Sequence, residues 1–179
     1  TKNDWDLAQS LWVKDHMSLF SPEKEKFLQP FVSAFQENLA AYNSLPKGVV
    51  HNDANDQNIM LSPDLIDPTI TGIIDFGDLA YTQTICELGV AAAYVMNDFP
   101  DPLEAILPLV KGYNSIIPLE ENELHLLYHV IATRLIISLT VGRINALENP
   151  ANEYVQISQK AMWENLNRWA GVNSFFAEF

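Results

Sequence analysis

Two polar motifs, each next to an apolar run, most tightly constrain the fold of this 179-residue chain. The first is the loop His51-Asn52-Asp53-Ala54-Asn55-Asp56-Gln57-Asn58, which has the pattern HxDxxxxN. The second ends an apolar run and reads Ile73-Ile74-Asp75-Phe76-Gly77-Asp78. The apolar segments around them predict short strands at 48–51, 58–61 and 69–76. We therefore expect Asp53 and Asn58 on one loop, with Asp75 at the end of an adjacent strand and its carboxylate facing Asn58.

The order and spacing of these motifs are those of the kinase catalytic loop H-R-D-L-x-x-x-N and its later D-F-G. In that chemistry a loop Asp accepts or orients the proton of the attacking hydroxyl. An Asn five positions later and the strand-end Asp hold Mg²⁺ against the nucleotide phosphates. Asn and Asp suit this metal because magnesium prefers oxygen ligands.

The chain resembles the aminoglycoside phosphotransferase/choline kinase-like superfamily of small-molecule kinases. The segments 72–81 and 86–91 are especially similar to the hydroxylysine kinase branch, which also occurs in bacteria as phosphotransferase domains fused to class III aminotransferases. The resemblance is specific from about Val49 to Met96. It implies Asp53 as catalytic base, Asn58 and Asp75 as ligands of Mg²⁺ beside ATP or GTP, and a small, often amine-bearing alcohol as the hydroxyl acceptor.

The same resemblance implies supporting roles for two further residues. His51 would pack and hydrogen-bond within the loop, without carrying a proton. Glu87 would steady the catalytic loop, although an acidic residue in the first turn of a helix is also favoured by the helix dipole alone. Asn52 stands where many aminoglycoside kinases have Gly. This difference bears on the subfamily to which the chain belongs more than on whether it is active.

The charge distribution is uneven, with 10 Lys+Arg against 23 Asp+Glu and no basic residue between Lys47 and Lys111. That gap holds ten acidic residues: Asp53, Asp56, Asp64, Asp67, Asp75, Asp78, Glu87, Asp98, Asp101 and Glu104. Many of them can form a solvated surface, but carboxylates near a core require a metal ion, a cationic ligand or a raised pKa. Asp56 and Asp78 are candidates for contacts to a substrate ammonium. The net charge of −13 disfavours a nucleic-acid partner.

The remaining sequence predicts helices at 4–20, 21–44, 84–96, 102–113, 118–147 and 152–170. The expected fold is mainly α with a small β patch (α+β), corresponding to the C-terminal, large lobe of a protein kinase-like fold. We divide it into leading helices at 1–47, a catalytic loop and metal-binding hairpin at 48–82, and a helical subdomain at 83–179. The apolar stretch from Leu126 to Val141 contains polar residues and predicts a buried helix, with no membrane span.

The chain lacks a Gly-rich phosphate loop and a strand lysine that would pair with phosphate. We therefore expect the N-terminal nucleotide-binding lobe to be absent and the isolated chain to be inactive. The single cysteine, Cys86, is compatible with a reducing, cytoplasmic location.

Several alternatives remain open at this point. The chain could be a pseudokinase-like module that binds a cationic small molecule without catalysis. It could also be a metal-dependent hydrolase, but such a site would require His ligands that are missing around the motifs, and Asn58 and Asp75 suit magnesium better than zinc. Glu121, His125 and His129 have a spacing that could hold zinc or serve hydrogen bonding between helices. Arg134, in an apolar helix, predicts either a structural ion pair or a contact to a substrate carboxylate or phosphate.

Overall fold

The computed structural model of the chain describes residues 3–64, 66–150 and 153–172. Its elements are, in chain order, the 3₁₀ helix η1 (Leu7–Leu19), α1 (Pro22–Asn43), β1 (Lys47–Val50), β2 (Ile59–Leu61), β3 (Ile70–Ile73), the 3₁₀ turn η2 (Phe76–Asp78), β4 (Ala80–Gln83), α2 (Ile85–Val95), the 3₁₀ turn η3 (Met96–Asp98), α3 (Pro102–Ile116), α4 (Glu121–Glu148) and α5 (Glu153–Ala170). Helices dominate and the strands are short, so the predicted α+β class is confirmed.

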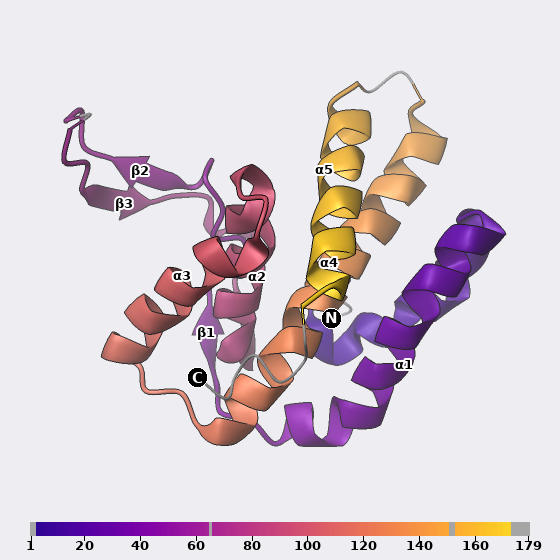
Figure 1. Ribbon diagram of the computed structural model, residues 1–179, viewed down its shortest axis with the longest axis horizontal. Coiled ribbons are helices and arrows are strands. Elements are labelled where there is room, and N and C mark those ends of the chain that lie inside the picture. The colour runs from indigo at the N-terminus through magenta and orange to yellow at the C-terminus, as the bar shows by residue number, and fades with distance from the viewer. Residues whose placement is uncertain (1–2, 65, 151–152, 173–179) are drawn as a thin grey trace.

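The long helix α4 is the centre of the hydrophobic core. It packs against η1, α1, α2 and α5, which surround it in Figure 1. By length and composition α4 could cross a membrane, but 72% of its most apolar stretch is buried inside the protein. Its apolar character is thus explained by its place in the core, as the sequence predicted.

The first helical segment differs from the predicted α-helix. Residues Leu7–Leu19 form a 3₁₀ helix, and Asp6 caps it by accepting a hydrogen bond from the backbone N–H of Ala8. The first three buried residues, Leu7, Ser10 and Val13, recur every three positions, and the fourth, Met17, follows four positions later. Three residues per turn is the period of a 3₁₀ helix, so the first three buried side chains share one face.

Helix α1 begins where the sequence predicted. Ser21 caps it by accepting a hydrogen bond from the N–H of Lys24, and Pro22 occupies the first helical position. The buried face of α1 is formed by Leu28, Val32, Phe35 and Tyr42, whereas Phe27, Phe31 and Leu39 are only partly buried.

The strands form two separate antiparallel pairs. β1 pairs with β4, and β2 pairs with β3 in a hairpin that projects away from the helices in Figure 1. β4 was missed by the sequence prediction, which placed only helices after the second motif. The predicted third strand is also shorter than expected, because Asp75 adopts a left-handed backbone conformation and the chain turns there.

A buried polar contact joins α1 to α2. The Tyr42 hydroxyl and the Cys86 sulfur lie 2.7 Å apart, and both side chains are fully buried. Burial raises the pKa of the Cys86 thiol to about 12, so the thiol stays protonated at neutral pH. Cys86 is therefore a packed structural residue.

Helices α2 and α4 approach closely at Gly89. A Cβ atom added at Gly89 would overlap Cγ1 of Val130, far inside van der Waals contact. Gly112 in α3, by contrast, has no atom within 4 Å of such a Cβ among the described residues.

We predict opposite effects of alanine at these two glycines. Gly89→Ala should lower the free energy of unfolding by about 1–3 kcal/mol, because the added methyl group forces α2 and α4 apart. Gly112→Ala should raise it by about 0.5–1 kcal/mol, because Ala restricts the unfolded chain and favours the helix. Urea unfolding of both variants measures the difference. Equal effects at the two positions would contradict the close contact.

Candidate active site

The residues of the two motifs line one cleft of about 450 Å³. Among its lining residues are Asp53, Asp56, Asn58, Asp75, Asp78 and Arg134. The first loop follows β1, Asp75 follows β3, and Arg134 comes from the middle of α4. The predicted meeting of the two motifs is therefore found in the structure.

A larger groove of about 910 Å³ lies between the start of α1, the end of α4 and α5. Its walls include Phe20, Phe27 and Trp163, and it contains none of the motif residues. The candidate chemistry therefore belongs to the smaller cleft, where acidic and amide side chains converge.

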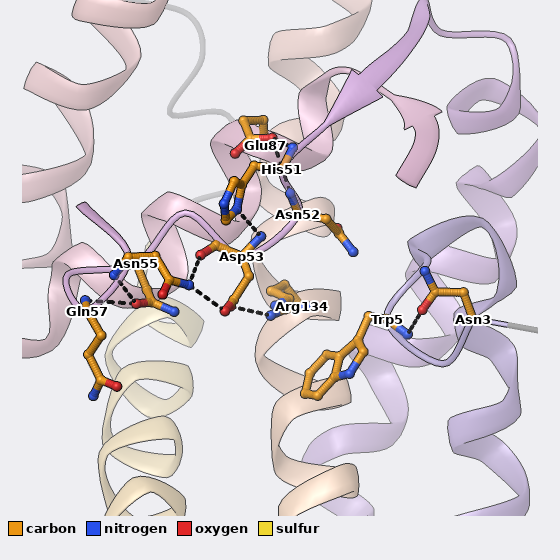
Figure 2. A network of polar contacts seen from close by, with 10 residues as sticks. Asn3, Trp5, His51, Asn52, Asp53, Asn55, Gln57, Glu87 and Arg134 are labelled. Atoms are coloured by element: carbon orange, nitrogen blue, oxygen red, sulfur yellow. Dashed lines mark hydrogen bonds and ion pairs between the residues drawn. The ribbon is translucent and has the colours of Figure 1, made fainter. Parts of the chain in front are cut away.

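Both carboxylate oxygens of Asp53 have a partner, as Figure 2 shows. Asn58 Nδ2 donates to the Asp53 backbone carbonyl and to Oδ2, both at 2.9 Å. Arg134 Nη2 lies 3.5 Å from Oδ1 and forms an ion pair with it. Part of the Asp53 side chain, 22%, remains exposed to the cleft. The carboxylate is thus held from two sides while still open to a ligand.

Backbone contacts shape the loop around Asp53. Asn55 Oδ1 accepts hydrogen bonds from the N–H groups of Gln57 and Asn58, at 2.9 and 3.2 Å. The N–H of Ile74 donates to the carbonyl of Asn58 at 2.9 Å. The last contact joins the first motif to the residue just before Asp75, so the two motifs are fixed relative to each other.

His51 lies under the loop and links its parts. The N–H of Asp53 donates to His51 Nδ1 at 3.3 Å, and His51 Nε2 lies 2.9 Å from the carbonyl of Ile74. Because Nδ1 accepts, the contacts fit a neutral ring with its hydrogen on Nε2, which donates to Ile74. The ring also meets Phe76 edge to face at 5.0 Å. These are the packing and hydrogen-bonding contacts expected for His51.

Glu87 reaches the loop from the first turn of α2. Its Oε2 accepts hydrogen bonds from the backbone N–H groups of His51 and Asn52, the second at 3.3 Å. His51 and Asn52 are buried, so these N–H groups depend on a protein acceptor. This contact agrees with the steadying role implied by the resemblance, and it goes beyond a helix-dipole interaction.

Two non-glycine residues of the site have left-handed backbone conformations. Asn52 has φ 66° and Asp75 has φ 61°. Asn and Asp tolerate this region better than other residues with a Cβ atom, which explains how Asn can stand where many aminoglycoside kinases have Gly. Both side-chain amide atoms of Asn52 are buried without a hydrogen-bond partner among the described residues.

The donor set of the cleft suits a hard cation. Because Asn58 Nδ2 donates to Asp53, the amide oxygen is the Asn58 atom suited to a metal. Asp75 is exposed, and its Oδ1 accepts a hydrogen bond from the N–H of Gly77 at 3.4 Å. Oxygen ligands of this kind fit Mg²⁺. That the Asp75 carboxylate faces Asn58 stays a prediction.

The zinc alternative finds no support. Within the described residues no group of three His, Cys, Asp or Glu side chains could hold a metal ion. His125 Nε2 instead lies 3.5 Å from Glu121 Oε1, one turn away on the exposed side of α4. His129 packs against the ring of Tyr128, and burial lowers its pKa.

Sequence reasoning missed the partner of Arg134. Of its two predicted roles the structure shows an ion pair, but with the candidate catalytic base Asp53. Trp5 places its ring over the guanidinium, 4.3 Å from the ring centroid to Cζ. The signal in the sequence was a lone Arg in an apolar helix, which indicates that a partner exists without saying which one.

The chain belongs to the phosphotransferase enzyme family, whose model matches residues 2–114. It is 30% identical to hydroxylysine kinase from Xenopus laevis over 171 residues, which are 90% of this chain and 46% of that protein.

Two further relatives carry the same name. Hydroxylysine kinase from Danio rerio is 35% identical over 122 residues, 66% of this chain and 34% of that protein. The enzyme from Mus musculus is 25% identical over 174 residues, 92% of this chain and 46% of that protein. The predicted superfamily and its hydroxylysine kinase branch are thus confirmed, and the chain spans less than half the length of these relatives.

We predict that Glu87 stabilises the loop through its hydrogen bonds. Glu87→Ala should lower the free energy of unfolding by about 1–3 kcal/mol, because two backbone N–H groups lose their acceptor. Glu87→Gln should lower it less, since the amide retains an oxygen acceptor. Glu104→Ala is the matched control, because Glu104 is an exposed acid in the first turn of α3. If Glu87→Ala and Glu104→Ala unfold alike in urea, Glu87 acts only through the helix dipole.

Proposed function

We propose that this chain is the C-terminal catalytic lobe of a small-molecule kinase. The enzyme transfers the γ-phosphate of ATP or GTP, with Mg²⁺, to a hydroxyl group of a small, amine-bearing acceptor. The single observation that carries the proposal is the convergence of Asp53, Asn58 and Asp75 on one cleft. Hydroxylysine, which the names of the relatives contain, is the first acceptor to test.

Asp53 would act on the acceptor hydroxyl. Its carboxylate is partly exposed to the cleft and oriented by Asn58 and Arg134. A carboxylate in this position can accept the hydroxyl proton or align the hydroxyl oxygen for in-line attack on the γ-phosphate. Phosphoryl transfer depends mainly on positioning, so a well-held Asp53 is what the reaction requires of this loop.

Asn58 and Asp75 would hold the metal with the nucleotide. Their amide and carboxylate oxygens are the donors, and each comes from a different motif. When bound, Mg²⁺ would neutralise charge on the β- and γ-phosphates. The hydrogen bond from Asn58 to Asp53 would then couple the metal side of the cleft to the hydroxyl side.

A nucleotide-binding lobe would complete the cleft. Apolar side chains stand exposed on and beside the β2–β3 hairpin, among them Met60, Ile70, Ile74 and Phe76. Exposed apolar clusters of this kind are typical of surfaces that another part of a protein covers. The relatives are more than twice as long as their matched segments, which leaves room for such a lobe. The assembled enzyme would work in the cytoplasm, where Cys86 stays reduced.

We predict that the full-length protein phosphorylates 5-hydroxylysine in the presence of Mg²⁺ and ATP or GTP, and that EDTA abolishes turnover. Asp53→Asn should lower kcat about 100-fold or more, while the acceptor KM changes little, because the amide cannot take the proton. The assay follows nucleoside diphosphate release and phosphorylated product by mass spectrometry. The 179-residue chain alone should be inactive.

Other outcomes of this assay would contradict the proposal. Tight acceptor binding without any phosphorylation would favour the pseudokinase-like module that binds a cationic small molecule. Full activity of the 179-residue chain would show that a further lobe is dispensable. Unchanged kcat in Asp53→Asn would remove the assigned base.

A separate prediction concerns the charge of the acceptor. Asp56 and Asp78 line the cleft, so Asp56→Asn or Asp78→Asn should raise the KM of an amine-bearing acceptor about tenfold, through a lost charge-assisted contact, with little change in kcat. Asp67→Asn is the control, because Asp67 is exposed and lies outside the cleft. A preference of the wild-type enzyme for neutral or anionic alcohols would contradict the amine-bearing acceptor and leave the kinase proposal intact.

A further inference from the structure

Arg134 is the one Lys or Arg among the described residues that line the cleft. It projects from α4 toward the loop, and Figure 2 shows it beside the Asp53 carboxylate, with Trp5 on the other side of it. Its side chain is only 2% exposed. A guanidinium in such a place loses its hydration and requires compensating contacts.

The contacts that Arg134 makes compensate this burial poorly. Nη2 meets Asp53 Oδ1 at 3.5 Å, which is too long for a strong hydrogen bond. Nε and Nη1 are buried and have no hydrogen-bond partner among the residues that the structure describes. The Trp5 ring provides a cation–π contact on one face. A residue present for stability alone would have better contacts, because buried ion pairs with unsatisfied donors are often less favourable than an apolar side chain of similar size.

We propose that Arg134 is a positioning residue for Asp53, an inference that rests on the proposed phosphoryl transfer. The guanidinium attracts Oδ1 while Asn58 holds Oδ2 by a hydrogen bond, so the two contacts together favour one orientation of the carboxylate. Trp5 restricts the guanidinium by lying over its face. In this role Arg134 acts through Asp53 and makes no direct contact that the acceptor or the nucleotide requires.

Three variants of the full-length protein test this role. Arg134→Met removes the charge with a side chain of similar length, and Arg134→Lys retains the charge without the planar group. Arg134→Met combined with Asp53→Asn shows whether the two positions act as a unit. Arg143→Met is the matched control, since Arg143 is an exposed residue on the same helix and lies outside the cleft.

We expect Arg134→Met to lower kcat about 10- to 100-fold with the acceptor KM unchanged. Its thermal unfolding midpoint should equal or exceed that of the wild type, because Asp53 is partly exposed and water can replace the guanidinium. Arg134→Lys should recover part of kcat. In the Asp53→Asn background, Arg134→Met should change kcat no further, because the carboxylate that it positions is gone.

Opposite results would overturn the inference. A rise in acceptor KM at constant kcat would make Arg134 a substrate contact, and a lower unfolding midpoint with unchanged kcat would make it structural. An additive loss in the double variant would separate it from Asp53. If Arg134→Met does not fold, Arg134→Lys carries the test, and wild-type kcat in that variant refutes positioning by the planar group. Absence of phosphorylation by the wild type would refute the proposed function itself, a result distinct from all of these.

Discussion

Burial of α4 is the constraint on which the rest of the structure depends. The helix packs against η1, α1, α2 and α5, so its side chains face protein on most of its circumference. Most buried residues in its central turns are apolar, Thr133, Arg134 and Thr140 are polar, and of these only Arg134 carries a charge. Because the helix is fixed by its neighbours, this single charge is held at a defined place beneath the catalytic loop, where it meets Asp53.

The loop itself is held by a set of hydrogen bonds. The side chains of Asn55 and Asn58 form hydrogen bonds with the loop's own backbone, and His51 bridges to the carbonyl of Ile74. Glu87, on α2, accepts hydrogen bonds from two N–H groups of the loop. Each contact engages a polar group that would otherwise compete for water or lie buried without a partner. As a result, the acidic and amide side chains of the loop face the cleft, and its backbone groups form hydrogen bonds with the rest of the protein.

Most of the site could be predicted from the sequence because its residues lie close together along the chain. Asp53 and Asn58 belong to one loop, and Asp75 follows the next hairpin, so their meeting requires only short strands. Helix α1 was equally readable from Ser21 and Pro22. Strand β4 could not be predicted, because four residues are too few to show the alternating pattern of a strand. Its pairing with β1 also depends on the intervening hairpin. The pairing of Arg134 with Asp53 was out of reach, since it follows from how α4 is seated in the core.

The close approach of α2 and α4 at Gly89 has a consequence for the geometry of the cleft. Glu87, two residues before Gly89, holds one end of the loop, and Arg134, one turn beyond Val130, reaches Asp53 within it. The loop, the two helices and the ion pair thus form a closed ring of contacts. In such a ring the spacing between the helices sets the span across which Asp53 is held. Because Gly89 has no side chain, α2 and α4 can lie close together. This short distance between the helices helps to place the Arg134 guanidinium within reach of the Asp53 carboxylate.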